Sequence, residues 1–168
     1  MSFSLLPDII LERLTDITPE LLRSRGVSLL MMDFDNTIVP YTTDVPTDAF
    51  CRWLERMQAS DVQLCVVSNS RKPRVVTFCR KYGIDCITHA RKPFSKGIRQ
   101  CLKHYDRSPK ACALVGDQIY TDTLGAKGAN VQAILVRAID NHNFWLKLRH
   151  VAEKPFIFAA RKRRVGYE

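Results

Sequence analysis

Short apolar runs alternate along this chain with segments in which apolar residues recur every three or four positions. Runs of about six residues are typical of buried strands, and the recurring spacing is typical of amphipathic helices. The runs occupy residues 27–32, 62–67, 84–88, 111–115 and 131–136. The spacing predicts helices that begin near Pro46 or Thr47, at Pro73, near Phe94 and near Thr121, and a last helix near residues 143–151.

Because strands separated by helices form parallel β-α-β units, this order predicts an α/β protein. We expect a three-layer α/β/α Rossmann-like fold around a central parallel sheet, with right-handed crossovers. A chain of 168 residues has the size of one domain, so residues 1–168 are assigned to a single domain.

The two ends of the chain differ in character. Residues 1–26 are predicted to be a helical segment, because the apolar residues between Leu5 and Ile17 form one stripe. A second short helix is expected in the same segment, with Thr18 as its N-cap and Pro19 in its first turn. At the other end, residues 152–168 form a basic tail that contains Phe-Ile-Phe at 156–158 and Arg-Lys-Arg-Arg at 161–164.

The composition, 46% hydrophobic and 26% charged, is that of an ordinary globular protein. No apolar stretch approaches the ~20 residues that cross a bilayer, and the first residues lack the basic region of a secretory signal. Six scattered cysteines without a Cys-x-x-Cys pair are predicted to be reduced core thiols. These features predict a cytoplasmic protein, with peripheral membrane association left open.

The chain carries 26 Lys and Arg against 17 Asp and Glu, a formal net charge of +9 at pH 7. Such an excess attracts nucleic acid, anionic lipid surfaces or phosphorylated substrates. A solvated basic surface with no dedicated partner has the same composition, so charge alone does not separate these alternatives.

Polar side chains follow four of the predicted strands at the point where each strand ends. Asp33 and Asp35 come directly after the first run, where α/β folds bind ligands at the carboxyl edge of the sheet. The other three signatures are Ser68-Asn69, Arg91-Lys92-Pro93, and Gly116-Asp117 with Thr121-Asp122 a few residues later. Because parallel strands share one direction, all four should gather along one edge.

Carboxylates gathered in this way would repel one another, and a hard divalent cation such as Mg²⁺ relieves that repulsion. Acids, a lysine and a hydroxyl together provide what phosphoryl transfer requires. Each signature also has an ordinary structural explanation: a turn at Ser68, helix caps at Asp117 and Asp122, and a solvated charge at Lys92. Their joint order after four strands favours the functional interpretation.

With these motifs the chain resembles class III phosphatases of the haloacid dehalogenase (HAD) superfamily. Within that class it is similar to the YqeG-type family, which is itself similar to mitochondrial phosphatidylglycerophosphatases. The resemblance runs from about Phe3 to Val136. It is carried by Asp33-x-Asp35-x-Thr37, Ser68-Asn69, Lys92-Pro93 and Gly116-Asp117-Gln118-x-x-Thr121-Asp122.

The resemblance implies a role for each motif residue. Asp33 would be the nucleophile that forms an aspartyl-phosphate, and Asp35 would protonate the leaving oxygen and later deprotonate water. The Asp33 carboxylate, the Asp35 carbonyl and Asp117 would hold Mg²⁺. The phosphate would be bound by Ser68, the Asn69 amide and Lys92, while Asp122 would orient Lys92 or hold a metal-bound water. Whether Arg91 or Lys92 enters the site is left open, although Pro93 after Lys92 matches the family pattern.

Relatives in this superfamily usually take their specificity from an inserted cap domain. Here each gap between motifs is filled by one helix-strand unit, so the resemblance implies no cap domain and an open site. Such a site suits a bulky phosphomonoester or one at a membrane surface. The N-terminal apolar stripe and the basic tail could supply the apolar and polybasic signals of peripheral binding.

Three functions follow in order of preference. The first is a Mg²⁺-dependent phosphomonoesterase, with phosphatidylglycerophosphate as the best single substrate. The second is a phosphatase for nucleotides, nucleic-acid ends or sugar phosphates, which the charge also permits. The third is a non-catalytic module on an old phosphatase scaffold that binds RNA, ribosomes or membranes. The chain lacks the basic and aromatic platform of RNA-binding domains, and it keeps the motif acids that degenerate relatives would be expected to lose.

Overall fold

The computed structural model describes residues 6–140 of the chain. The helix predicted near residues 143–151, the apolar residues 156–158 and the rest of the basic tail 152–168 lie outside the described residues.

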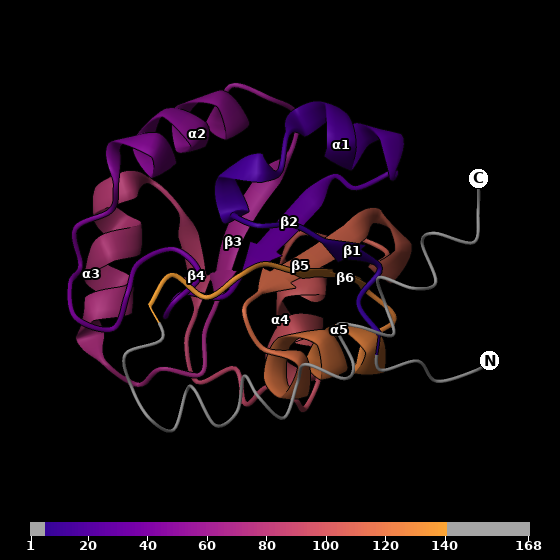
Figure 1. Ribbon diagram of the computed structural model, residues 1–168. Helices are drawn as coiled ribbons and strands as arrows, with labels where there is room; N and C mark the ends of the chain where they lie inside the picture. Colours follow the sequence, from indigo (N-terminus) through magenta and orange to yellow (C-terminus); the bar gives the residue numbers. More distant parts are fainter. Residues whose placement is uncertain (1–5, 141–168) are drawn as a thin grey trace.

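Six parallel strands form one sheet in the order β1-β6-β5-β2-β3-β4 (Figure 1). The central strand β2 pairs on both sides and is buried along its whole length. A strand covered on both faces is a continuous apolar run, which is why sequence alone locates it. The strands are β1 (Ile9–Ile10), β2 (Leu29–Met32), β3 (Gln63–Val67), β4 (Asp85–Ile87), β5 (Cys112–Gly116) and β6 (Gln132–Leu135).

The helices begin and end at residues that favour those positions. The hydroxyl of Thr47 accepts a hydrogen bond from the Phe50 amide at the start of α2, and Gly83 ends α3 in the left-handed conformation. The helices are α1 (Pro19–Ser24), α2 (Asp48–Gln58), α3 (Pro73–Tyr82), α4 (Lys96–His104) and α5 (Leu124–Gly128). Shorter turns are η1 (Leu14–Asp16), η2 (Pro109–Ala111) and the π-helical turn η3 (Ile119–Thr123).

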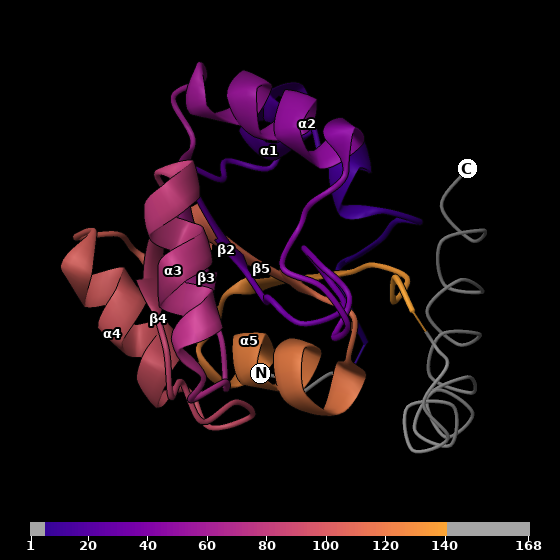
Figure 2. The same cartoon turned by 90° about the vertical axis from the view of Figure 1, so that its left-hand side faces the viewer.

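Helices cover both faces of the sheet, so the predicted three-layer α/β/α fold is confirmed. Alternate residues of β2 point to opposite faces: Leu30 and Met32 join the core under α1, α2 and α3, while Leu29 and Met31 join the core with α4 and α5. In the turned view α1 and α2 lie on one side of the strands and α5 on the other (Figure 2). Only five residues, 68–72, separate β3 from α3, and the described chain holds no inserted cap domain.

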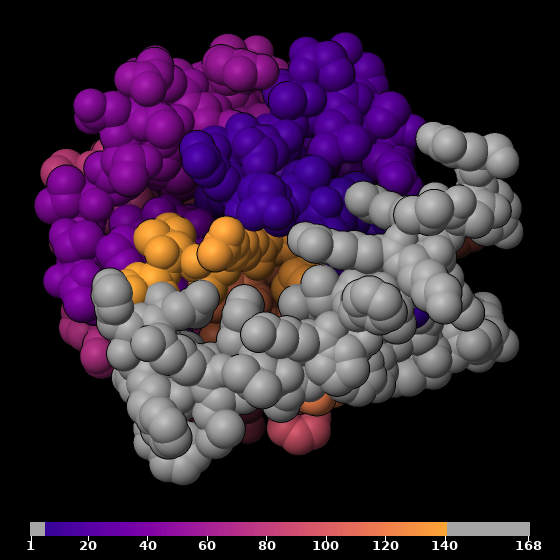
Figure 3. Space-filling model, in the orientation of Figure 1, coloured from indigo at the N-terminus to yellow at the C-terminus, as the bar shows by residue number. Residues whose placement is uncertain are grey.

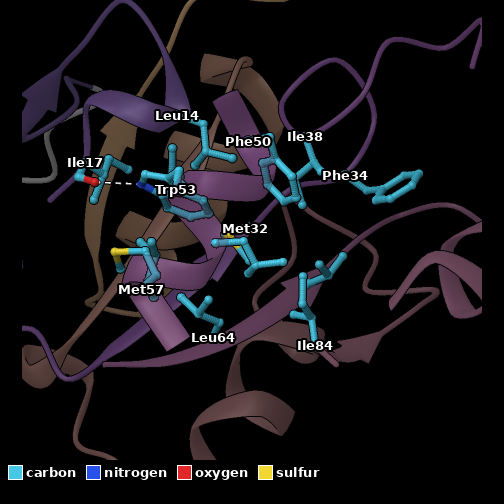
Figure 4. Close-up of a cluster of buried hydrophobic side chains, with 14 of the residues drawn as sticks. Leu14, Ile17, Met32, Phe34, Ile38, Phe50, Trp53, Met57, Leu64 and Ile84 are labelled. Atoms are coloured by element: carbon cyan, nitrogen blue, oxygen red, sulfur yellow. Dashed lines mark hydrogen bonds between the residues drawn. The ribbon is translucent and has the colours of Figure 1, made fainter. Parts of the chain in front are cut away.

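The core on the α2 side is aromatic and aliphatic, and it fastens the N-terminal segment to the domain (Figure 4). The Trp53 ring is buried, and its Nε1 donates a hydrogen bond to the Ile17 carbonyl at 2.7 Å. This bond satisfies the polar atom of an otherwise apolar ring. All six cysteines are free, and four of them are buried, as predicted for core thiols.

The prediction of a helix over the N-terminal apolar stripe is wrong. Ile9–Ile10 instead forms the edge strand β1, which pairs with Ile134 and Leu135 of β6. The Leu11 amide donates to the Leu135 carbonyl at 2.9 Å. A tertiary partner that satisfies the backbone overrides the local helical spacing, because unpaired buried amides are costly. The second part of the prediction is confirmed, since α1 begins after Thr18 with Pro19 in its first turn.

The segment that follows β6 lies against the N-terminal segment (Figure 3). The Arg137 amide donates to the Glu12 carbonyl at 3.2 Å. These two segments and the chain after β2 line a hollow of about 850 Å³. The hollow reaches Thr37 and Pro40 but none of the candidate catalytic residues. Among residues 6–140, no helix has the length and apolar character needed to cross a bilayer.

Candidate active site

The carboxyl ends of the four neighbouring strands β5, β2, β3 and β4 lie at one edge of the sheet. The strands β2, β3 and β5 end close to the same level, since Met32 lies opposite both Val66 and Val115. The residue after β2, Asp33, continues the pairing, and its amide donates to the Val115 carbonyl at 2.9 Å. The parallel topology therefore brings the chain segments after β2, β3, β4 and β5 to the same edge of the sheet.

Lys92 lies at the centre of a buried charged cluster at this edge. Its Nζ lies 2.6 Å from Oδ1 of Asp33 and 2.8 Å from Oδ1 of Asp122. The Lys92 side chain is 1% exposed, so its charge is removed from solvent. In the described part of the chain, the carboxylates of Asp33 and Asp122 are the ion-pair partners that compensate it. Lys92, rather than the exposed Arg91, thus enters the acidic cluster.

The Asn69 side chain fixes the backbone of Lys92. Its Oδ1 accepts from the Lys92 amide at 2.7 Å, and its Nδ2 donates to the Lys92 carbonyl at 2.8 Å. These two bonds join the segments after β3 and β4, so Asn69 contributes through its side chain as well as through the amide that sequence reasoning emphasised. The neighbouring Ser68 is buried, and its hydroxyl accepts a bond from the Ser70 amide at 3.0 Å.

Asp122 reaches Lys92 from the π-helical turn η3. Its second oxygen, Oδ2, accepts from the Gln118 amide at 3.2 Å, which holds the carboxylate in place. Gly116 makes room for it, because a Cβ atom at that position would overlap the Asp122 carboxylate. The contact with Lys92 fits the predicted role of Asp122 in orienting that lysine.

Three buried acids lie close enough to share a cation. Carboxylate oxygens of Asp33, Asp117 and Asp122 lie within 4.8 Å of one another. Lys92 balances part of this charge, and buried carboxylates in excess of their cations are costly. Hard oxygen donors at this spacing fit Mg²⁺, which takes one or two carboxylates and completes its shell with water or phosphate.

Burial and neighbouring charges shift the pKa values of these groups. Burial raises the pKa of Asp122 to about 6, although Lys92 beside it acts in the opposite direction. Burial disfavours the charged form of Lys92, but the Asp122 and Asp33 carboxylates outweigh it and raise the pKa of the ammonium. Burial also raises the pKa of Asp35, while Arg74 opposes that shift.

Arg74 is the site residue that sequence reasoning missed. Its Nη1 lies 3.1 Å from Oδ1 of Asp35, and its Nε contacts Asp44. Its guanidinium also donates to the carbonyls of Pro40, Tyr41 and Thr43, and it lies 5.2 Å from the Phe34 ring centre. Arg74 therefore fastens residues 40–44 to the start of α3. A cation in the first turn of a helix, where the helix dipole disfavours it, was the available signal.

Asn36 anchors the other end of the same loop. It has φ 64°, which Asn tolerates better than most residues, and its Nδ2 donates to the Asp140 carbonyl at 2.6 Å. The Asp140 amide returns a bond to Oδ1 of Asn36 at 3.2 Å. The loop after β2 is thus tied to the segment after β6.

Comparison with known proteins shows which family the chain belongs to. The family model described as HAD-hydrolase-like matches residues 89–144. A "Probable phosphatase YqeG" of Bacillus subtilis (strain 168) is 30% identical over 159 residues, which cover 94% of this chain and 92% of the relative.

Solved structures with the same fold are more distant in sequence. The 3-deoxy-D-manno-octulosonate 8-phosphate phosphatase of Yersinia pestis has a TM-score of 0.53 at 14% identity, over 80% of this chain and 76% of its own. The Moraxella catarrhalis enzyme of that name, in complex with a magnesium ion, a phosphate ion and KDO, has a TM-score of 0.50 at 13% identity, over 89% and 98%. The fold and the near full-length similarity together identify the chain as a phosphatase of the HAD superfamily and a member of the YqeG family.

Proposed function

We propose that this phosphatase is a Mg²⁺-dependent phosphomonoester hydrolase that works through an aspartyl-phosphate on Asp33. The observation that carries the proposal is the Lys92 ammonium held between Asp33 and Asp122 at the carboxyl edge of the sheet. A fixed, buried positive charge beside a carboxylate nucleophile is suited to a phosphoryl group, because it stabilises the charge that the transferring oxygens carry.

In the first step, the Asp33 carboxylate attacks phosphorus and the bond to the ester oxygen breaks. Asp35 gives its proton to the departing oxygen, so that an alcohol leaves. Burial raises the pKa of Asp35, and a shift in this direction supports the role because it favours the proton-carrying form that a general acid needs.

In the second step, Asp35 takes a proton from a water molecule that attacks the phosphorus of the aspartyl-phosphate. Inorganic phosphate leaves and the Asp33 carboxylate is regenerated. Ser68, the Asn69 amide and Lys92 would hold the phosphate oxygens through both steps. Asp122 would keep Lys92 in position through their 2.8 Å contact.

The three acids at this edge fit a resident Mg²⁺ ion by their chemistry and spacing. Asp33, the Asp35 carbonyl and Asp117 would hold it, and it would supply positive charge for the phosphate oxygens. The Asp122 carboxylate belongs to the same cluster, but its contact with Lys92 favours a place outside the metal's own ligands.

We propose phosphatidylglycerophosphate as the substrate to test first. The described chain has no cap domain over the site, which supports a substrate with a bulky group on the phosphate. Nucleotides, phosphorylated oligonucleotides and sugar phosphates are the alternatives, and they form the other arms of the experiment.

Phosphate release from this panel should be measured with Mg²⁺ and with EDTA, on the wild type, Asp33→Asn and Asp35→Asn. Asp33→Asn should abolish turnover, by a factor of about 10³ or more, because an amide is no nucleophile. Asp35→Asn should slow turnover less severely, because it removes proton transfer, and EDTA should stop the wild type. Asp44→Asn is the matched control, an exposed acid on the same loop. Wild-type activity in Asp33→Asn would overturn the mechanism.

A further inference from the structure

Exposed apolar side chains of residues 6–140 gather at one edge of the molecule. Each of the six large ones follows the carboxyl end of a strand, and none follows an amino end. Because the strands are parallel, these side chains share the edge that carries Asp33. They are Tyr41 and Val45 after β2, Val76 in the first turn of α3, Phe94 after β4, Tyr120 after β5 and Ile139 after β6.

Phe94 is the most prominent of them. It is 74% exposed, although it stands only two residues from the buried Lys92. The loop that carries it is held in place, since the Phe94 amide donates to the Arg91 carbonyl at 2.8 Å and Asn69 grips the Lys92 backbone. Pro93 packs close to Gly125 of α5. One exposed ring is ordinary on a protein surface, but Phe94 shares its edge with five other exposed apolar side chains, and such a group is a feature of interaction surfaces.

Positive charge accompanies this ring. Residues 62–105 contain ten Lys and Arg but a single acid, Asp85, so this part of the chain has the same formal excess, +9, as the whole. Those at the carboxyl edge with exposed side chains are Arg71, Lys72, Arg91 and Lys96. Phe94 therefore lies between two exposed cations, Arg91 and Lys96, while the buried Asp33 and Asp122 at the same edge are paired with Lys92.

We propose that this edge docks onto the surface of an anionic phospholipid bilayer and presents the Asp33 site to it. We call it the docking edge and define it by the six exposed apolar side chains given above together with Arg71, Lys72, Arg91 and Lys96. Cations attract acidic headgroups, and apolar side chains beside them enter the boundary of the acyl chains, so the two together give stable peripheral binding. Docking itself is independent of catalysis, and only the inference that the substrate is a lipid phosphomonoester rests on the proposed function.

The exposed side chains favour a bilayer over a nucleic acid. Three of the six, Val45, Val76 and Ile139, are aliphatic. Aliphatic groups gain from burial in lipid, whereas single-stranded nucleic acid is held by stacking on aromatic rings. The described chain also lacks a cap that would keep a flat surface away from Asp33.

The test is co-sedimentation of the full chain, as Asp33→Asn to prevent turnover, with vesicles of phosphatidylcholine with or without phosphatidylglycerol. Binding should require phosphatidylglycerol and weaken with salt. Phe94→Ser should lower the affinity by roughly tenfold, because one large apolar side chain no longer enters the lipid. Phe94→Trp should keep it. Unchanged binding in Phe94→Ser would overturn the proposal.

Two double charge-reversal variants distinguish binding through the docking edge from binding through the overall net charge of the protein. Arg71→Glu with Lys96→Glu changes the docking edge, whereas Lys81→Glu with Lys103→Glu changes the opposite ends of α3 and α4 by the same net charge. The first pair should abolish sedimentation and the second should leave most of it. Equal losses, or binding that depends only on residues 161–164, would overturn the proposal, as would preference for RNA over vesicles.

A soluble substrate separates this proposal from the proposed function. Phe94→Ser should hydrolyse p-nitrophenyl phosphate like the wild type and lose activity only on vesicle-borne phosphatidylglycerophosphate. If vesicles do not bind but soluble turnover depends on Asp33, docking fails and the phosphatase mechanism stands. If vesicles bind but Asp33→Asn remains active, the mechanism fails and docking stands.

Discussion

Two charged groups at the same edge of the sheet differ in how they are held. In the inner cluster, the side chains of Lys92, Asp122 and Asp33 are 1%, 3% and 11% exposed, and rigid strand ends and turns position them. In the outer pair, the side chains of Arg74 and Asp35 are 15% and 19% exposed and belong to a helix start and a loop.

The difference shows what each group contributes. Charges without solvent must be compensated by protein, so the inner cluster acts as a unit, and loss of one member leaves the others uncompensated. Charges that keep some water tolerate the loss of a partner, so the outer pair can adjust the loop after β2 without deciding whether the domain folds.

The sharpest test of this comparison is Lys92→Met. It leaves Asp33 and Asp122 buried without their cation, so we expect the free energy of unfolding at pH 7 to fall by about 3–5 kcal/mol. Phosphate release should fall by a factor of about 10² or more. Urea denaturation and a turnover assay measure the two effects. Lys103→Met, a change at an exposed lysine near the end of α4, should alter neither stability nor turnover of a soluble substrate. Equal stability of Lys92→Met and wild type would refute the idea of a unit.

A smaller effect is expected from Gly116→Ala. The added methyl group would overlap the Asp122 carboxylate and push it away from Lys92 without removing any charge. Overpacking of this kind costs about 1–3 kcal/mol, and we expect turnover to fall about tenfold because Lys92 loses its orientation. Thermal unfolding and steady-state kinetics are the measurements.

Gly128→Ala is the matched control for that variant, because nothing lies within 4 Å of a Cβ at the end of α5. It should be neutral or slightly stabilising, since alanine favours helices. If both alanine variants behave alike, crowding at Asp122 is not the cause.

The smallest effects belong to the outer pair. Arg74→Ala should lower kcat by about threefold to tenfold, because Asp35 and residues 40–44 lose a common anchor. It should change stability by about 1 kcal/mol or less. Asp44→Ala, which removes an exposed partner of Arg74, should change stability by less than about 0.5 kcal/mol. A loss in Arg74→Ala as large as in Lys92→Met would erase the distinction between the two groups.

Local signals gave reliable predictions where a short segment decides its own structure. Thr18 and Thr47 are N-caps whose hydroxyls accept backbone bonds, Pro73 begins α3, and Gly83 ends it with φ 65°. The continuous apolar run at β2 indicated a strand buried on both faces.

The N-terminal stripe failed because its apolar spacing suits a helix as well as a short strand followed by turns. What selects the strand is β6, whose residues are more than a hundred positions away along the chain. Arg74 was missed for a related reason, since its partners Asp35 and the carbonyls of Pro40 and Thr43 come from a separate loop.

By itself, the sequence determined the order of strands and helices after residue 26, the parallel architecture and the residues that stand at the strand ends, because periodicity and capping act over a few residues. Only the tertiary structure decided that Lys92 rather than Arg91 turns inward, that Asn69 grips its backbone, and that β1 completes the sheet. These outcomes depend on compensation of buried charges and backbone groups by partners distant along the chain, and such compensation exists only once the chain has folded.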